Sequence, residues 1–207
     1  MDDDSSIPCY GFGDVRTGHN SVFSFYTGNE MAKGLNSLVE RYKQIVQVVN
    51  MSGPTTFAPL IRQAMRDVHK SGMKFHVLFI LADGQISNEC LEETTTAICE
   101  AASFPLFIFM IGIGDGPWDE MRTFDDKVLP DRAWDNFHFF EYNVAARGDC
   151  DNEGSGEGQA VNAKLLAEIP TQFAEARSRV GKTDDAQVQQ ILTSFSDDLV
   201  IDPPSSG

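Results

Sequence analysis

Hydrophobic residues recur at steps of three and four positions in two segments of the chain. In the first segment they are Leu35, Leu38, Val39, Tyr42, Ile45, Val46 and Val49. In the second, which follows Ser52, Gly53 and Pro54, they are Phe57, Leu60, Ile61, Ala64, Met65 and Val68. Such spacing places the side chains on one face of an α-helix. We therefore predict two amphipathic helices, the second with Pro59 in its first turn, where proline is tolerated, and with its end near Gly72.

Two later segments, residues 75–81 and 106–113, are almost continuously hydrophobic. Strands of this kind are typical of parallel sheets that are buried on both faces. Residues 91–102 lie between them and fit a helix, so the three segments predict a βαβ unit with a right-handed crossover. Near the start, residues 7–13 and 22–26 predict a hairpin with a longer loop. The fold class is therefore α/β, with an open, mostly parallel sheet flanked by helices.

The last third of the chain predicts a short helix at 119–126, a final strand at 137–142, and a closing helix at 161–179 that Pro170 interrupts. We expect one domain over residues 1–180. An acidic, glycine-rich segment at about 145–160 is expected to be flexible, and residues 181–207 are expected to form a disordered tail.

Charge and composition narrow the function classes. The 207 residues carry a formal net charge of -15, which repels phosphate backbones, so we expect no nucleic-acid partner. The longest apolar run, residues 104–113, is too short to span a bilayer, and we expect no direct membrane insertion. The acidic start of the chain is unlike a secretory signal. We expect an intracellular, cytoplasmic protein with reduced cysteines, and nuclear or membrane association through partners is the alternative.

Enzyme motifs are incomplete in this sequence. Gly181-Lys182-Thr183 lacks the earlier glycine of a phosphate-binding loop, because that position is Ala176. The glycine-rich stretch at 112–116 is followed by Pro117 where a dinucleotide-binding loop has its third glycine. The four histidines stand singly, and no general base or nucleophile can be placed near Asp83. We therefore predict a protein that is not an enzyme and has no catalytic residues.

Two loops at the carboxyl ends of the predicted strands carry oxygen-bearing side chains. Residues 52–56 open the second helix and contain Thr55 and Thr56, and residues 82–85 leave a buried strand and contain Asp83. A carboxylate and a hydroxyl on neighbouring loops suit a hard cation such as Mg²⁺. The alternative is an ordinary turn at Asp83 and an ordinary helix cap at Thr55 or Thr56. The residues alone leave both interpretations open.

Several motifs carry a resemblance to a known family. They are residues 53–59, 79–85, 112–119 and 124–126, with further matches at 7–14, 135–137 and 167–170. Together they resemble the copine-type von Willebrand factor A domain over about residues 5–179. The sequence is most similar to the A domains of plant-type RING ubiquitin ligases, and next to the animal copines, which are calcium-dependent phospholipid-binding proteins.

The resemblance implies a metal-ion-dependent adhesion site. In this family Mg²⁺ or Mn²⁺ is held by an Asp-x-Ser-x-Ser loop, a threonine and a second aspartate, and an acidic side chain of a protein partner completes the site. Thr55 and Asp83 match the threonine and the second aspartate. The loop itself has no match, because residues 2–6 have adjacent rather than alternating serines. The resemblance therefore implies at most weak metal binding.

In the family the absent loop follows a first strand that lies mid-sheet, between the strands that match residues 7–13 and 75–81. The chain therefore resembles a domain without its first central strand and helix. Unpaired backbone in mid-sheet is costly, so we expect that the remaining strands close up, that another chain fills the gap, or that the sequence is part of a longer product.

The resemblance implies a non-enzymatic protein–protein interaction module with a partial adhesion site. Its expected partner is a protein that offers an acidic side chain. The alternative is the substrate- or partner-binding part of a ubiquitin ligase, or of a phospholipid-binding copine, whose RING or C2 domains are absent from these residues. A third hypothesis, metal-dependent hydrolysis at Asp83, has no partner residue to support it.

Overall fold

The computed structural model describes most of the chain, namely residues 6–28, 30–53, 55–84, 86–126, 129, 132–142, 157–179, 184–195 and 199–204. Its strands are β1 (Ser6–Ile7), β2 (Tyr10–Gly11), β3 (Val22–Ser24), β4 (Ala32–Lys33), β5 (His76–Ala82), β6 (Leu106–Gly112), β7 (Phe137–Glu141) and β8 (Val200–Ile201). Its helices are α1 (Gly34–Ile45), α2 (Ala58–Lys70), the 3-10 turn η1 (Asn88–Cys90), α3 (Leu91–Ala101), α4 (Asp119–Asp126), α6 (Glu157–Arg179) and α7 (Asp185–Ser194).

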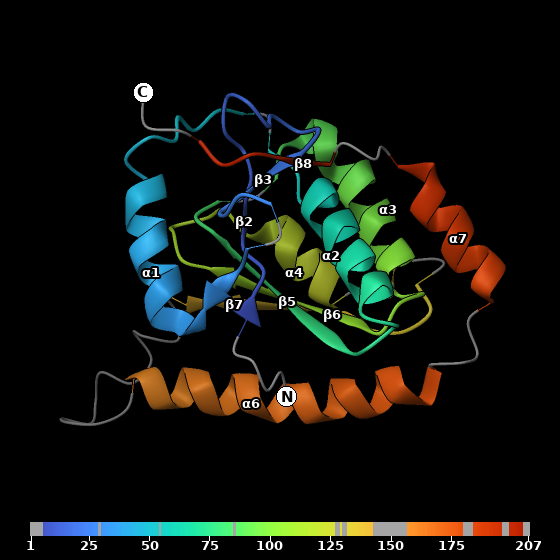
Figure 1. Ribbon diagram of the computed structural model, residues 1–207. Coiled ribbons are helices and arrows are strands. Elements are labelled where there is room, and N and C mark those ends of the chain that lie inside the picture. Colours follow the sequence, from blue (N-terminus) through green and yellow to red (C-terminus); the bar gives the residue numbers. More distant parts are fainter. Residues whose placement is uncertain are drawn as a thin grey trace.

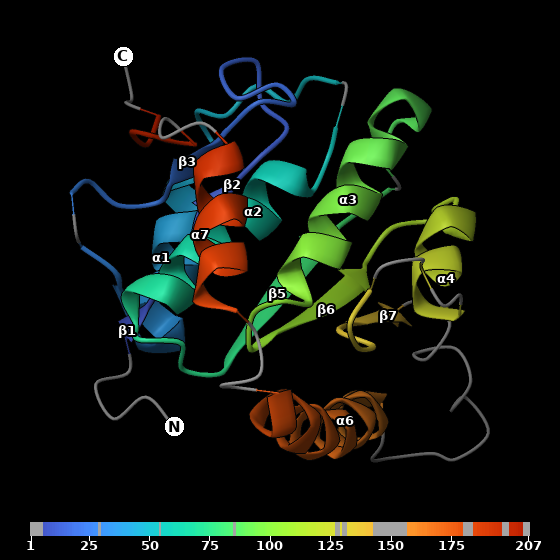
Figure 2. The ribbon, with the colours of Figure 1, turned by 90° about the vertical axis from the view of Figure 1, so that its right-hand side faces the viewer.

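The main sheet consists of three parallel strands in the order β5-β6-β7. Figures 1 and 2 show α2, α3 and α7 on one side of this sheet and α6 on the other. The central strand β6 is flanked on both sides, and its residues from Leu106 to Met110 are fully buried. This burial explains the continuous hydrophobic run in the sequence, because both faces of the strand meet helices.

Side chains that alternate along the strands fill two separate clusters. Ile80, Ile108 and Met110 face α2 and α3, where they pack against Ile61 and Ile98. Phe107 and Phe109, which alternate with Ile108 and Met110 along β6, face α6. They form an aromatic cluster with Phe140, Trp134 and Ala176. Successive side chains of a strand point to opposite faces of the sheet, so one continuous hydrophobic run provides apolar residues to both faces.

The remaining strands lie apart from the main sheet. β2 pairs antiparallel with β3, which confirms the predicted hairpin, and β8 pairs parallel with β3. β1 and β4 form a separate two-stranded ladder. In the part of the chain that the structure describes, β5 has only β6 as a partner. Among the described residues, β2 and β5 therefore belong to separate sheets.

Three predictions about the elements are wrong. β7 is not the final strand, because β8 follows it. Pro170 does not interrupt the closing helix, because α6 runs from Glu157 to Arg179 with this proline inside it. The tail predicted to be disordered contains α7 and β8, and Val188, Phe195 and Leu199 from this region are buried.

The flexible segment predicted at 145–160 lies outside the described residues up to residue 156, and residues 157–160 belong to α6. No helix in the described part of the chain is long and apolar enough to cross a membrane.

The predicted hydrophobic face of α1 is mostly exposed. Ile45 is buried, but Leu35, Val39, Tyr42 and Val46 have exposed fractions of 69%, 48%, 55% and 48%. The predicted helix is therefore present, but its hydrophobic face is mostly not covered by the described residues. The reason is that α1 packs mainly against the short strands β1 and β4 and does not lie on the main sheet.

Candidate functional site

Thr55 and Asp83 lie in two loops that the structure joins directly. The loop with Thr55 precedes α2, and Asp83 is the first residue after β5. The backbone N–H of Thr55 donates to Ser87 Oγ at 3.1 Å, and the N–H of Ser87 donates to the carbonyl of Thr55 at 3.1 Å. Ser87 stands four residues after Asp83, so these paired hydrogen bonds hold the Thr55 loop against the Asp83 loop.

The side-chain oxygens of the two predicted ligands are available. Asp83 is exposed and Thr55 is half-buried. Within the described residues, neither the carboxylate of Asp83 nor the hydroxyl of Thr55 has a hydrogen-bond or ion-pair partner. Such oxygens match the donor type that Mg²⁺ and Mn²⁺ prefer.

Thr56, the neighbouring candidate, has a structural role. Its side chain is buried, its Oγ1 accepts a hydrogen bond from the N–H of Ala58 at 3.1 Å, and it shares a second hydrogen bond of 3.0 Å with Thr94 Oγ1. It therefore bonds to the first backbone N–H of α2 from just before the N-cap, Phe57, and links the start of α2 to α3. The N-cap of α2 is Phe57, which has no side-chain cap hydrogen bond, so neither Thr55 nor Thr56 is the ordinary helix cap that the sequence left open.

The glycine-rich loop after β6 forms one side of this site. A Cβ on Gly114 would lie 2.2 Å from the carbonyl oxygen of Asp83, so only glycine allows this approach of the two backbones. The N–H of Ile113 also donates to the carbonyl of Ala82 at 2.9 Å. Gly114, from the stretch that resembled a dinucleotide-binding loop, thus packs the β6 loop against the Asp83 loop.

The loop after β2 reaches the same cluster of loops. The N–H of Ser52 donates to the carbonyl of Gly13 at 2.8 Å, and a Cβ on Gly13 would lie 3.5 Å from Thr55 Oγ1. Gly13 has a φ of +72°, which side chains disfavour. Next to it, Asp14 is 1% exposed and forms an isolated bridge with Met51.

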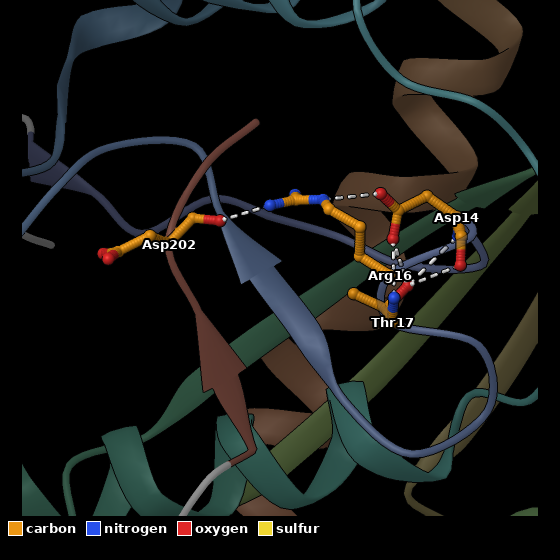
Figure 3. A network of polar contacts seen from close by, with 4 residues as sticks. All are labelled: Asp14, Arg16, Thr17 and Asp202. Atoms are coloured by element: carbon orange, nitrogen blue, oxygen red, sulfur yellow. Dashed lines mark hydrogen bonds and ion pairs between the residues drawn. The ribbon is translucent and has the colours of Figure 1, made fainter. Parts of the chain in front are cut away.

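Asp14 is not available as a ligand, because its carboxylate is fully engaged (Figure 3). Oδ1 accepts from the N–H and the hydroxyl of Thr17 at 2.8 and 2.6 Å, and Oδ2 accepts from Arg16 Nε at 3.1 Å. Burial raises the pKa of Asp14, but these hydrogen bonds and the charge of Arg16 outweigh it, so the pKa lies below its usual value.

Sequence reasoning missed both Asp14 and Ser87. The spacing of Asp14 and Thr17 was a usable signal, because an aspartate often caps the turn that follows it through the residue three positions on. Ser87 carried no local signal, since its partner Thr55 is 32 residues away.

The described residues contain no group of three or more His, Cys, Asp or Glu side chains that could hold a metal ion. Thr55 and Asp83 suit a hard cation by donor type, but together they offer two protein ligands, and Mg²⁺ would keep several waters in such a site. Their role as ligands stays a prediction.

Comparison with known proteins identifies the family. The family model described as Copine matches residues 1–184. This chain belongs to the copine family. It is 41% identical over 183 residues to the E3 ubiquitin-protein ligase RGLG5 of Arabidopsis thaliana, with 84% of this chain and 42% of that protein covered. It is 44% identical over 164 residues to Copine family protein 1 of Caenorhabditis elegans, with 79% and 14% covered.

The copine chain therefore spans less than half the length of these relatives. Among solved structures, the manganese-loaded TRAP protein of Plasmodium vivax is similar with a TM-score of 0.47 and 11% identity, over 69% of this chain and 55% of that one. Family membership and the observed helix-flanked parallel sheet confirm the predicted von Willebrand factor A-like α/β class.

Proposed function

We propose that this copine-family chain is a non-enzymatic protein-interaction module, and that its partner binds at the loops around Thr55 and Asp83. The observation that carries the proposal is the joining of these loops by the Thr55–Ser87 hydrogen bonds, with two unused oxygen ligands at their surface. The edge of an α/β sheet at the carboxyl ends of its strands is where such folds bind ligands.

A divalent cation provides the attraction for an acidic partner in this proposal. Thr55 and Asp83 hold Mg²⁺ or Mn²⁺ weakly, with water in most coordination positions, and a carboxylate of the partner replaces one water. Without the cation, the charge of -15 on the chain repels an acidic partner. The interaction should therefore be lost in the presence of a chelator.

Titration with Mn²⁺ alone tests the metal part of the proposal. We expect binding with a dissociation constant of about 1 mM, in line with sites that have few protein ligands. Asp83→Ala should weaken it at least about tenfold, because it removes the one charged ligand, and Thr55→Val should weaken it less. Asp185→Ala removes an equally exposed aspartate from α7 and should change nothing. Equal Mn²⁺ affinity for the parent chain and Asp83→Ala would contradict the proposal.

A glutamate-containing peptide is the probe for the partner. Its binding, measured by fluorescence anisotropy, should require Mn²⁺ and should disappear with EDTA or with Asp83→Ala. A peptide with glutamine in place of glutamate is the matched control and should not bind. Peptide binding that persists in EDTA would exclude the cation-bridged mode.

A second candidate function is the substrate-binding part of a ubiquitin ligase. The identity of 41% to RGLG5, described as an E3 ubiquitin-protein ligase, favours it. The family match on this chain is the copine region, so ligase activity would reside in another part of such a protein. Fusing the chain to an active RING domain should direct ubiquitin to proteins that bind the Asp83 loops, and Asp83→Ala in the same fusion should abolish that transfer.

A further inference from the structure

Strand β5 has an open backbone edge. The N–H of His76 donates to the carbonyl of Pro105, and the N–H of Ile113 donates to the carbonyl of Ala82, both at 2.9 Å. In a parallel ladder, every second residue of a strand directs its N–H and C=O groups to the same neighbouring strand. The even-numbered residues of β5 therefore bond to β6, and the N–H and C=O groups of Val77, Phe79 and Leu81 point away from it. Within the described chain no strand pairs with them.

The side chains along this edge are apolar and exposed. Phe79 and Leu81 are 44% and 59% exposed, and they lie on the face of the sheet that α6 covers only in part. The β6–β7 register continues this surface to Ile113 and Tyr142, which are 46% and 44% exposed. β5 itself contains no lysine or proline, the residues that commonly prevent edge strands from pairing.

We propose that the open edge of β5 pairs antiparallel with the same edge of a second copy of this chain. The outward-pointing residues fix the register, with Phe79 opposite Phe79 of the second copy and Val77 opposite Leu81. Each pair exchanges two backbone hydrogen bonds, so all the open groups of β5 are satisfied. The two exposed Phe79 rings and the Val77–Leu81 pairs are then covered on the same face of a sheet that continues through both copies.

The charges at the two ends of β5 favour a second copy in this orientation. Lys74 is exposed just before the strand, and Asp83 is exposed just after it. In the proposed register Phe75 lies opposite Asp83, so Lys74 of each copy lies beside Asp83 of the other. A parallel partner of the same chain would instead bring like charges together. The two-fold arrangement also closes, because each copy uses the same edge.

The net charge of -15 on each copy opposes association, so the dimer should be weak and its population should depend on protein concentration. This inference does not rest on the proposed function, because it needs neither a metal ion nor an acidic partner, although both use the charge of Asp83. Binding of Mn²⁺ by a chain that stays monomeric would leave the proposed function intact while overturning the dimer.

Molar mass measured by light scattering over a wide range of concentrations tests the interface. The parent chain should change from monomer to dimer as the concentration rises. Leu81→Lys places a charge on the edge, and Phe79→Pro removes an N–H that points away from β6, so both should keep the main sheet and stay monomeric. Leu35→Lys changes another exposed leucine, on α1, and should dimerise like the parent.

Circular dichroism should show that the three variants are folded. A parent chain that is monomeric at every concentration would overturn the proposal. It would also be overturned by a dimer that Leu81→Lys leaves unchanged, or by one that Leu35→Lys disrupts equally, because the contact would then lie elsewhere.

Disulfide formation tests the register. Residues opposite each other in an antiparallel bonded pair have Cα atoms about 5.5 Å apart, within reach of a disulfide. Phe79→Cys should therefore cross-link two copies under mild oxidation. The thiols of Leu81→Cys would stand about 13 Å apart and should cross-link no more than the parent chain, whose native cysteines give the background. Equal cross-linking at the two positions, or more at position 81, would overturn the register.

Discussion

Asp14 connects the loop after β2 to two other parts of the chain. Its carboxylate accepts hydrogen bonds from Thr17 and Arg16, and Arg16 Nη1 donates to the carbonyl of Asp202 at 3.1 Å (Figure 3). Arg16 also lies over the Phe23 ring at 5.4 Å. The network thus holds the C-terminal segment against the hairpin, next to the loops of the candidate site.

Thr17→Val tests this network. The substitution keeps the shape of the side chain and removes the hydroxyl that donates to Asp14 Oδ1 at 2.6 Å. Leaving a buried carboxylate without one of its hydrogen-bond donors costs about 1–3 kcal/mol. The free energy of unfolding, measured in urea, should fall by that amount. Thr96→Val is the matched control, because Thr96 is exposed and its hydroxyl bonds only to the carbonyl of Glu92. Similar losses for both variants would contradict the structural role of Asp14.

At the scale of elements, α7 shows how the C-terminal region adds to the core. Val188 is 5% exposed and packs into the main cluster. Phe195 follows the helix and lies under Arg62 and Arg66, whose guanidinium carbons are 5.8 and 5.0 Å from the ring centroid. Arg66 also donates to the carbonyl of Phe195 at 3.4 Å. These contacts attach α7 to α2, which a disordered tail would not do.

Val188→Asp distinguishes the docked helix from a disordered tail. If α7 is docked, the new carboxylate is buried without a partner, and the free energy of unfolding should fall by about 3 kcal/mol. Gln187→Asp introduces the same charge at the preceding, exposed position and should change stability by less than about 0.5 kcal/mol. Thermal unfolding followed by circular dichroism measures both. Identical curves for the two variants would show that α7 does not pack on the core.

At the scale of the whole molecule, the acidic groups determine how stability depends on pH. Burial raises the pKa of Asp67, although the Tyr10 hydroxyl that donates to it at 2.9 Å partly offsets the effect. Burial likewise raises the pKa of Glu100 and Asp135, offset in part by Arg62 and Arg132 respectively. These carboxyl groups bind protons more tightly in the folded chain than in the unfolded chain. Their contribution to stability is therefore lost as the pH rises through their folded pKa values.

Lowering the pH from neutrality towards the usual carboxyl pKa should raise the midpoint of thermal unfolding, because the carboxyl groups with raised pKa values bind protons first in the folded chain and the net charge becomes smaller. Asp67→Asn should reduce this dependence. Asp115→Asn removes the same charge from an exposed loop position and should leave the slope close to that of the parent. A midpoint that falls steadily over this range would contradict the prediction. Below the usual aspartate pKa the midpoint should instead fall with the pH, because protonation of Asp14 destabilises the folded chain.

Local patterns of residues were sufficient to predict the main helices and strands and the family. The spacing of residues 57–68 predicted α2 with Pro59 in its first turn, and the runs at 75–81 and 106–113 predicted β5 and β6. These features depend on which side chains must leave water, and that information is present in a short window of residues. The motifs around Thr55 and Asp83 were local enough to indicate copine membership, which the comparisons confirmed.

Which predicted faces are buried, and which loops meet, depends on packing between distant parts of the chain. The face of α1 has the period of a buried helix, yet Tyr42 is exposed, because burial depends on a distant partner surface. The tail near Val188 lacks a strong local pattern, yet α2 gives it a surface to dock on. Ser87 holds the Thr55 loop through contacts across 32 positions, and among the described strands β5 pairs only with β6. Such contacts are set by the free energy of the whole folded chain, which no short window of sequence contains.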